Sequence, residues 1–304
     1  MKIAIALAVF AGFAGPAAPA LAAPAAGAPA ITPTPTATAF AAPAAGPAHP
    51  AAAAAATTAP AVTAAPGGAA APGVTPTTTG AAAPATGPVP VLVARYGFDG
   101  GAVGGHVADT SGRGPVLTIR AADQGVIRFE GAPQGGRYIA FPDICPTTTT
   151  VCPRALLEAP SDADLNPGAR LFRWSARVHV LKTQVKGSAN IVQKGVANTG
   201  SQWKMQIGAT QGRAQCVVVG VGSPTAYLVR SAGTVADGLW HKILCQRSGS
   251  TLSVYIDGVV KGTTTIPATL SITNTLPMRI GGANFNARSD MYHGLLDDVY
   301  AELG

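Results

Sequence analysis

The sequence predicts an all-β fold in which two antiparallel sheets pack face to face. Short apolar runs recur from residue 91 to residue 300, separated by Gly, Pro, Asn and Ser. No stretch of ten residues in this part has a helical hydrophobic period. One stretch alternates strictly between apolar and polar residues, as a strand with one buried face must. Together these observations favour a sandwich of many short strands.

The alternating stretch is the most specific of these signals. One set of its side chains should point into the core, and it comprises Phe172, Trp174, Ala176, Val178 and Val180. The intervening set should point outward, and it comprises Arg173, Ser175, Arg177 and His179.

The other elements follow from shorter apolar runs. Strands are expected at 91–98, 116–119, 126–129, 138–141, 191–194, 203–207, 215–221, 226–230, 242–246, 252–256, 278–280 and 295–300. A long loop is expected at 142–168, with one helical turn at 154–159. Asp257-Gly258 predicts a hairpin turn, because Gly accepts a positive φ at little cost. Gly281-Gly282 should end a strand and start a loop, and Trp240 is expected to pack in the core or on a sheet.

The N-terminal part of the chain predicts export. Lys2 precedes an apolar stretch at 3–13, and Ala20-Leu21-Ala22 has the form of a signal-peptidase site. The apolar stretch is shorter than the roughly 20 residues that span a bilayer. We therefore expect a signal peptide at 1–22 and a secreted, extracellular protein, with the cell wall as one destination.

Residues 23–88 predict a disordered linker rich in Ala, Pro and Thr. No Lys, Arg, Asp or Glu occurs from Ala23 to Ala94, and the segment has few large apolar side chains to offset chain entropy. Such a tether could hold a domain away from a surface, or it could be a spacer without a role of its own. The folded domain is expected at 89–304.

Four cysteines lie in the expected domain, and an even number in an exported chain indicates disulfides. Three pairings are open. The pairing Cys145–Cys152 with Cys216–Cys245 is the one expected, since the first pair closes a short ring. A Cys₄ zinc site is the alternative, but the spacings lack a C-x₂-C pair.

Charge argues against a nucleic-acid partner. The chain has 21 basic and 14 acidic residues, a net charge of +7. The basic residues are scattered rather than gathered in a stripe with interleaved aromatics. We expect no nucleic-acid partner and no membrane span after removal of the signal.

Four ordered motifs near the C-terminus support a resemblance to a known family. They are Leu239-Trp240-His241, Val254 to Gly258, Arg279 to Gly282, and His293 to Val299. Upstream, Tyr96 to Asp99, Asp109 to Gly112, Phe129 to Gly131 and Ile191 to Gly195 add to the pattern. Together they resemble a laminin-G-like domain of the concanavalin A-like lectin/glucanase superfamily. The resemblance implies a jelly-roll sandwich, and it departs from the family at Arg177, where an aromatic residue is common.

The same resemblance implies a candidate metal site. If Leu295 and Val299 point into the sandwich, Asp297 shares their face, and a buried carboxylate needs partners. Backbone N–H groups could supply them. A structural calcium ion could do so too, because jelly rolls of this superfamily often bind one, with Asp99 or Asp109 as further ligands.

The resemblance extends to glucanases, but the residues that they use for catalysis are missing. Those enzymes place two Glu and one Asp at alternating positions of one strand. Here the acidic strand carries Asp297 and Asp298, expected on opposite faces, and no leading Glu. The domain has three Glu in all and shows neither a Gly-x-Ser-x-Gly elbow nor a His-Glu-x-x-His site. No catalytic residue is assigned.

The expected function is a secreted, non-catalytic binding module for a carbohydrate or a cell-surface ligand, protein or glycan. The alternatives are a polysaccharide-cleaving enzyme with an atypical site, and a wall-associated structural or adhesive protein. Ligand-binding side chains are expected in two polar loops, where an ordinary surface loop is the competing interpretation. They are Asn198, Asn284, Phe285, Asn286, Arg288 and Asp290.

Overall fold

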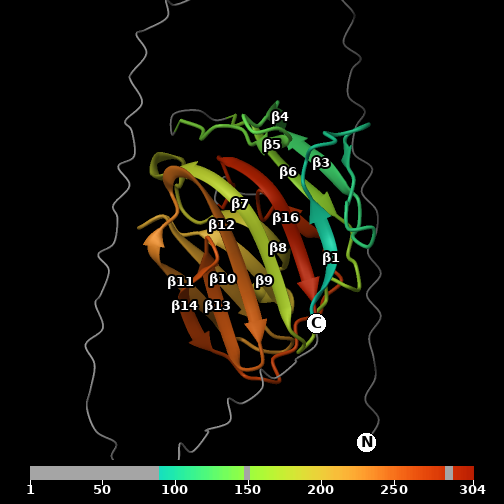
Figure 1. The fold of residues 1–304 in the computed structure, drawn as a ribbon, viewed down its shortest axis with the longest axis vertical. Coiled ribbons are helices and arrows are strands. Elements are labelled where there is room, and N and C mark those ends of the chain that lie inside the picture. The colour runs from blue at the N-terminus through green and yellow to red at the C-terminus, as the bar shows by residue number, and fades with distance from the viewer. Residues whose placement is uncertain (1–88, 147–150, 285–289) are drawn as a thin grey trace, which may run out of the picture. The chain divides into compact units, whose positions relative to one another are not determined.

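The computed structural model describes residues 89–146, 151–284 and 290–304. These residues form strands, two short 3₁₀ helices, η1 (Lys182–Gln184) and η2 (Ala197–Thr199), and no α-helix. The strands build two antiparallel sheets that lie one behind the other (Figure 1). The predicted all-β sandwich is therefore confirmed. The expected signal peptide and linker lie outside the described residues. Within them, no helix is long and apolar enough to span a bilayer.

The sheet nearer the viewer in Figure 1 is called sheet A here. Its strand order is β14-β13-β12-β7-β16-β5-β4, and β1 also pairs with β16. The bounds are β14 (Val259–Thr265), β13 (Thr251–Ile256), β12 (Asp237–Ser248), β7 (Phe172–Leu181), β16 (Leu295–Leu303), β5 (Arg137–Ala140), β4 (Arg128–Gly131) and β1 (Val91–Tyr96).

The opposite sheet, sheet B, has the order β11-β10-β9-β8-β15-β6-β3-β2. The bounds are β11 (Ala226–Thr234), β10 (Arg213–Val219), β9 (Gln202–Ile207), β8 (Ala189–Gly195), β15 (Met278–Ile280), β6 (Arg154–Ala159), β3 (Leu117–Ala122) and β2 (His106–Val107). All neighbouring strands of sheet B are antiparallel. The two sheets pack face to face, so each buries one face against the other.

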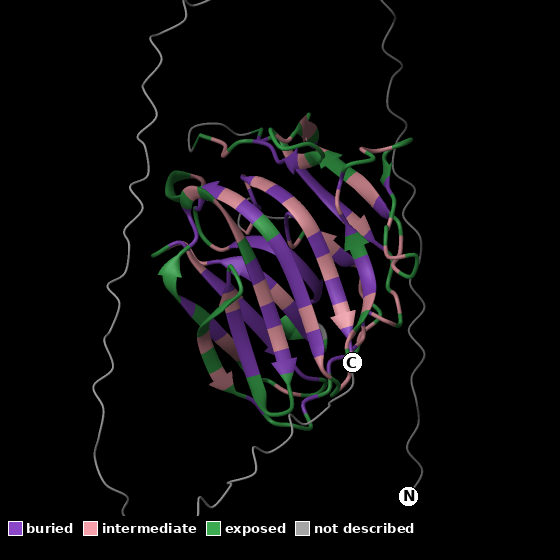
Figure 2. Ribbon diagram, in the orientation of Figure 1, coloured by how far each residue is buried: buried purple, intermediate pink, exposed green. Residues whose placement is uncertain are grey.

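The core lies between the sheets and follows the predicted alternation. The inward set of β7, from Phe172 to Val180, is at most 1% exposed, which gives the striped burial pattern of the front strands (Figure 2). Phe172 and Trp174 of sheet A meet Trp203 of sheet B, with ring centroids 5.3–5.9 Å apart. Aromatic contacts of this kind add to the burial of apolar surface that holds the sheets together.

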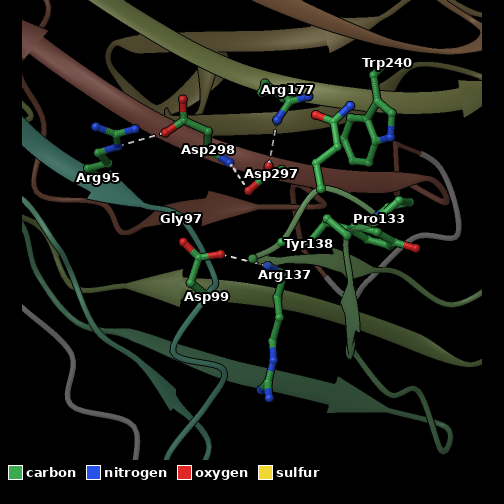
Figure 3. Close-up of a pocket in the computed structure, with 14 residues that line it drawn as sticks. Arg95, Gly97, Asp99, Pro133, Arg137, Tyr138, Arg177, Trp240, Asp297 and Asp298 are labelled. Atoms are coloured by element: carbon green, nitrogen blue, oxygen red, sulfur yellow. Dashed lines mark hydrogen bonds and ion pairs between the residues drawn. The ribbon is translucent and has the colours of Figure 1, made fainter.

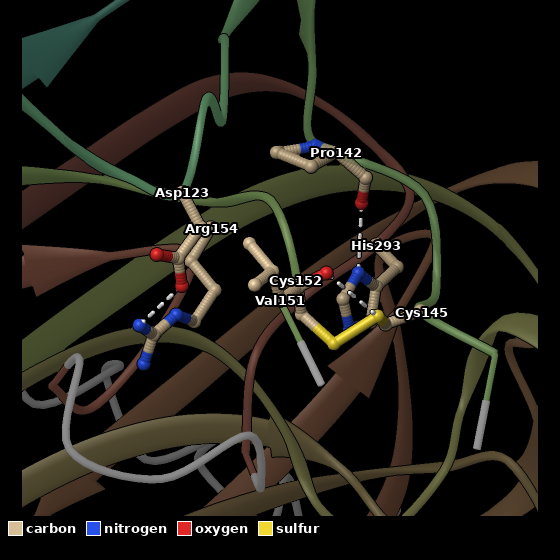
Figure 4. Close-up of a disulfide and its surroundings, with 7 residues drawn as sticks. All are labelled: Asp123, Pro142, Cys145, Val151, Cys152, Arg154 and His293. Atoms are coloured by element: carbon tan, nitrogen blue, oxygen red, sulfur yellow. Dashed lines mark hydrogen bonds and ion pairs between the residues drawn. A yellow bond between two sulfur atoms is a disulfide. The ribbon is translucent and has the colours of Figure 1, made fainter. Parts of the chain in front are cut away.

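Both predicted disulfides are present. Cys216 of β10 bonds to Cys245 of β12, so this bridge joins sheet B to sheet A through the core. Cys145 bonds to Cys152 and closes a short ring beside β6 (Figure 4). His293 fixes the chain before this ring, because its Nδ1 lies 2.7 Å from the carbonyl oxygen of Pro142. No free cysteine remains to form the alternative zinc site.

The helical turn expected at 154–159 is wrong, because these residues form strand β6. β6 lies inside sheet B between β3 and β15, and Ala155, Leu156, Leu157 and Ala159 are fully buried. A strand covered on both faces has a continuous apolar run instead of an alternation, so a short one resembles a buried helical turn.

Two further strands have no counterpart in the predicted set. β2 has only two residues, and β14 is an exposed edge strand without apolar alternation. The predicted turn before β14 is confirmed, because Asp257 (φ 52°) and Gly258 (φ 82°) both have the positive φ of a type I′ hairpin.

Candidate ligand-binding site

The candidate site lies where β16 changes its neighbour in sheet A. Leu295 and Leu296 pair with β5, whereas the strand pairs with β1 from Val299 onward. Asp297 and Asp298 fall between these two ladders. β1 and β5 thus diverge along the same edge of β16. Between them, the two adjacent carboxylates have no strand paired beside them at this edge.

A β-bulge fixes how these carboxylates point. The register between β16 and β7 shifts between Asp297 and Tyr300, and Asp298 has a φ of 44°. Leu296 and Val299 point into the core, whereas Leu295 is only half buried. The assumption that Leu295 points inward is therefore wrong, and Asp297 lies on the outer face of sheet A. The expectation that Asp297 and Asp298 lie on opposite faces is also wrong, because both line one pocket.

Asp297, a half-buried carboxylate, has both a backbone N–H group and a positively charged side chain as partners. Its Oδ1 accepts the backbone N–H of Asp298 at 2.8 Å, and its Oδ2 lies 3.2 Å from Nη1 of Arg177. Burial nevertheless raises the pKa of Asp297, and repulsion from the Asp298 and Asp99 charges raises it further. The Arg177 charge acts in the opposite direction but does not cancel the rise. Asp298 is paired with Arg95, with Oδ1 2.9 Å from Nε.

Arg177 also connects the carboxylates to an aromatic surface. Its guanidinium carbon lies 5.3 Å from the ring centroid of Trp240, a cation–π arrangement. The Trp240 ring contacts Tyr138 and His179, with centroids 5.5 Å away in each case. Trp240 is half buried on the outer face of sheet A, so of its two expected places, the core or a sheet surface, the structure shows the second. Arg177, where the sequence departs from the family pattern, and Trp240 therefore belong to one feature.

The opposite wall comes from the chain after β1 and from the β4–β5 turn. Oδ1 of Asp99 accepts the backbone N–H of Arg137 at 2.7 Å (Figure 3). Gly136, at φ 79°, packs against this carboxylate, since a Cβ here would lie 2.5 Å from Oδ1 of Asp99 and the positive φ disfavours other residues. The walls enclose a pocket of about 760 Å³. Its charged lining residues are Asp99, Asp297, Asp298, Arg95, Arg137 and Arg177.

The pocket combines an aromatic surface with balanced charges. A ring such as Trp240 can stack on an apolar ligand face, while carboxylates accept and guanidinium groups donate hydrogen bonds to ligand hydroxyls. This combination suits a polyhydroxylated ligand. Sequence reasoning missed the aromatic part, since Trp240 starts a strand segment whose phase is set by a bulge between Asp237 and Trp240.

Of the predicted calcium ligands, the structure brings two to the same pocket, Asp99 and Asp297. Asp109 does not line it. Its oxygens accept the backbone N–H groups of Arg95 (2.7 Å) and Gly114 (3.1 Å) and the hydroxyl of Ser111, so it shapes the turn after β2. Among the described residues, no group of three or more His, Cys, Asp or Glu side chains could hold a metal. Asp109 therefore does not join the other two carboxylates, and a calcium ion held by Asp297 and Asp99 stays an untested alternative to hydrogen bonding.

Of the predicted loop residues, the three that the structure describes do not line this pocket. Asn198 is exposed in η2, and Asn284 is exposed after β15. Asp290 lies beside sheet B, where its carbonyl oxygen accepts the backbone N–H of Asn190 at 3.0 Å. Phe285, Asn286 and Arg288 lie outside the described residues. Ligand binding by these two loops stays a prediction.

Comparison with known proteins relates part of this chain to a family. Residues 163–301 match the family described as the concanavalin A-like lectin/glucanases superfamily. This segment belongs to that superfamily. The laminin-G-like resemblance is thereby confirmed, and the superfamily segment contains Arg177, Trp240, Asp297 and Asp298. No curated protein matches the sequence.

Solved structures show the same fold. Domain 4 of an extracellular arabinanase from Geobacillus stearothermophilus, solved with arabinotriose, matches with a TM-score of 0.54 and 16% identity over 71% of this chain and 93% of that one. The binding domain of Paraclostridial Mosquitocidal Protein 1 matches with a TM-score of 0.51 and 15% identity, over 69% of this chain and 48% of that one. A structure of botulinum neurotoxin type C, a toxin whose cell entry depends on two ganglioside molecules, matches with a TM-score of 0.50 and 11% identity. The match covers 69% of this chain and 47% of that one. The chain thus spans about half the length of the two toxin chains, and these identities concern the fold alone.

Proposed function

We propose that this protein is a secreted, non-catalytic binding module and that it holds a carbohydrate in the pocket beside Trp240. The observation that carries the proposal is the joint placement of Trp240, Arg177 and Asp297 on the outer face of sheet A. The aromatic ring supplies a stacking surface, and the charged pair supplies a donor and an acceptor next to it.

The structural neighbours support the class of ligand. The arabinanase domain was solved with a bound trisaccharide, and the neurotoxin depends on gangliosides, which are glycolipids. The two disulfides are compatible with an extracellular place of action. The expected tether would then present the domain at a distance from the cell surface.

A glycan array with the full exported chain tests the proposal. We expect binding to a defined set of glycans, and we expect Trp240→Ala to reduce the affinity by about tenfold or more, since an aromatic stacking surface contributes on this order. Leu239→Ala is the matched control, because Leu239 is the adjacent residue, is 62% exposed and does not line the pocket. Equal loss in both variants, or no binding to any glycan, would contradict the proposal.

The alternative of a polysaccharide-cleaving enzyme needs a separate assay. Asp297 and Asp298 share the pocket, but each forms an ion pair with an arginine, at 3.2 Å and 2.9 Å. We expect no release of reducing ends from a polysaccharide panel. Release that Asp297→Asn and Asp298→Asn both abolish would establish catalysis in place of simple binding.

A further inference from the structure

A second polar surface lies on the outer face of sheet B, on the far side of the sandwich from Trp240. Gln206 of β9 is the register partner of Gln215 on β10, and Gln215 is the partner of Arg230 on β11. Since neighbouring strands lie about 4.8 Å apart, the three side chains form a row about 10 Å long across the strands. Asn190 of β8 extends the row, as the register partner of Gln206.

The amides of this row are buried but incompletely bonded. Gln206 is 6% exposed, and its Nε2 donates to Oε1 of Gln215 at 2.6 Å. Its own Oε1 has no hydrogen-bond partner among the described residues, and the same holds for Oδ1 of Asn190, a residue that is 1% exposed. Buried polar atoms are normally paired. Gln206 lines a pocket, so its incompletely paired amide is a candidate to turn toward a ligand group there, whereas Asn190 does not line that pocket.

Arg213 and Arg230 lie beside this row. Among the described residues, neither Arg213 nor Arg230 has a side-chain hydrogen bond or an ion pair. Most other described arginines pair with a carboxylate, as Arg173 does with Glu302 and Arg279 with Glu158. Two unpaired guanidinium groups at one place create a positive potential that favours an anionic ligand.

A pocket of about 680 Å³ lies at this place, and the β9–β10 turn closes it on one side. Its lining includes Gln206, Gln215, Arg213 and Arg230. Gly208 of that turn leaves room for the Gln215 amide, because a Cβ at this position would overlap it. The charged lining residues described are Arg213 and Arg230, with no carboxylate. The Trp240 pocket, in contrast, has three carboxylates and three arginines, so the two surfaces should select different ligands.

We propose that this surface of sheet B is a second binding site, which takes a saccharide bearing carboxylates. Arg213 and Arg230 bind the carboxylate, for which the planar guanidinium offers parallel N–H donors. Gln206 and Gln215 bind the hydroxyls, because an amide can both donate and accept. Uronic-acid polysaccharides have this combination along the chain. The proposal is independent of the ligand that the Trp240 pocket takes.

Calorimetry with the full exported chain tests this site. The probes are tetragalacturonate, tetramannuronate and a hyaluronate tetrasaccharide, and neutral galactotetraose is the comparison. We expect at least one acidic probe to bind about tenfold or more tightly than galactotetraose, as a charge-assisted carboxylate pair implies. Failure of all three acidic probes to bind, or equal affinity for the neutral one, would overturn the proposal.

Variants separate this site from general attraction between opposite charges. Arg213→Gln with Arg230→Gln should lower the affinity for the acidic probe about tenfold or more. Lys242→Gln with Lys261→Gln removes the same charge from exposed positions of sheet A and should change it less than about threefold. Trp240→Ala should leave it unchanged. If Trp240→Ala abolishes binding and the arginine variant does not, the second site is disproved while the proposed function stands. If only the arginine variant loses binding, the second site is established whatever the Trp240 pocket does.

Discussion

Nδ1 of His241 lies 2.8 Å from Oδ2 of Asp257, which links the start of β12 to the β13–β14 turn. Nε2 of the same imidazole lies 3.1 Å from Oδ2 of Asp237, so the ring is held between two carboxylates. Burial by itself would lower the pKa of His241, but the hydrogen bonds and charges of Asp257 and Asp237 outweigh it and raise the pKa. The Trp-His and Asp-Gly motifs of the sequence therefore meet in one structural clamp.

The clamp predicts a stability contribution that depends on pH. A histidine whose folded pKa is raised stabilises the fold fully below its unfolded value of about 6.5, and this contribution is lost as pH rises through the folded pKa. Burial by itself would raise the pKa of Asp257, but the hydrogen bonds from His241 and from the Lys242 N–H outweigh burial and lower it. The stability that Asp257 contributes is therefore lost in acid. We expect Asp257→Asn to lower Tm by about 2–4 °C near pH 6, corresponding to about 1 kcal/mol for a half-exposed charged hydrogen bond.

Thermal melts of both proteins from pH 4 to pH 9 check this prediction. Asparagine tolerates the positive φ of position 257, so the variant keeps the turn. The difference in Tm should be largest near pH 5–6 and shrink above pH 8. A difference that stays constant over the whole range would show that the charge of His241 contributes nothing.

The inter-sheet disulfide predicts a larger loss than the short ring. Chain-entropy arguments give about 3.6 kcal/mol for the Cys216–Cys245 loop and about 2.5 kcal/mol for the Cys145–Cys152 ring. We expect the double Ala variant at 216 and 245 to unfold at lower urea concentration than the double Ala variant at 145 and 152. Both Cys216 and Cys245 are fully buried in the core, so a cavity adds to the first loss. Equal denaturation midpoints would contradict this order.

The fold could be predicted because β7 reports its environment directly. One face of this strand meets the core and the other meets polar surroundings, so Phe172 to Leu181 alternates in sequence as in space. β6 could not be predicted, because burial on both faces removes the alternation. Edge strand β14 could not be predicted either, since it buries little.

The site could be predicted only in part, because it depends on backbone irregularities. A period-2 interpretation places Asp297 and Asp298 on opposite faces, but the bulge at Asp298 brings both to one pocket. The bulge before Trp240 likewise sets which face its ring occupies. Bulges leave no clear signal in a single sequence, whereas Asp297 was detected since a carboxylate in an apolar strand needs an explanation.

Lys194 predicts a gain of stability in mildly alkaline solution. Its side chain is fully buried, and its Nζ donates to Oδ1 of Asn166 (2.8 Å) and to the carbonyl oxygen of Asn274 (2.7 Å). Burial lowers the pKa of Lys194 to about 8. The unfolded chain, with a lysine pKa near 10.4, then binds more protons than the folded one between pH 8 and pH 10, so stability rises with pH there.

Comparison with Lys194→Met isolates this effect. At pH 7 the variant should be less stable by about 2–3 kcal/mol, because two or more buried acceptors lose their donor. The advantage of the unsubstituted protein should grow by up to about 3 kcal/mol from pH 8 to pH 10, as 1.36 kcal/mol per pKa unit implies. Urea titrations at the two pH values measure it, and a constant difference would contradict a lowered pKa.

Calcium is expected to leave the fold unchanged. Arg177 already neutralises Asp297, and Asp109 is committed to its own turn, so a divalent ion would have only Asp99 and Asp297 as carboxylate ligands. Thermal melts with millimolar calcium and with a chelator should give the same Tm. A rise in calcium that Asp297→Asn abolishes would instead establish the predicted metal site.

Ligand binding in the Trp240 pocket should weaken as the pH is lowered. The weakening should begin at a higher pH than it would if the pocket held a carboxylate with an ordinary pKa. Burial raises the pKa of Asp297, so this acceptor is protonated above the usual aspartate value of about 3.9. A raised pKa also means that the folded protein takes up this proton more readily than the unfolded chain, so the step removes no stability. Calorimetric titration of the best-bound glycan between pH 4 and pH 7 should show that the affinity decreases as the pH is lowered. The same titration of Asp297→Asn should be flat, and parallel curves for the two proteins would place the pH dependence on another group.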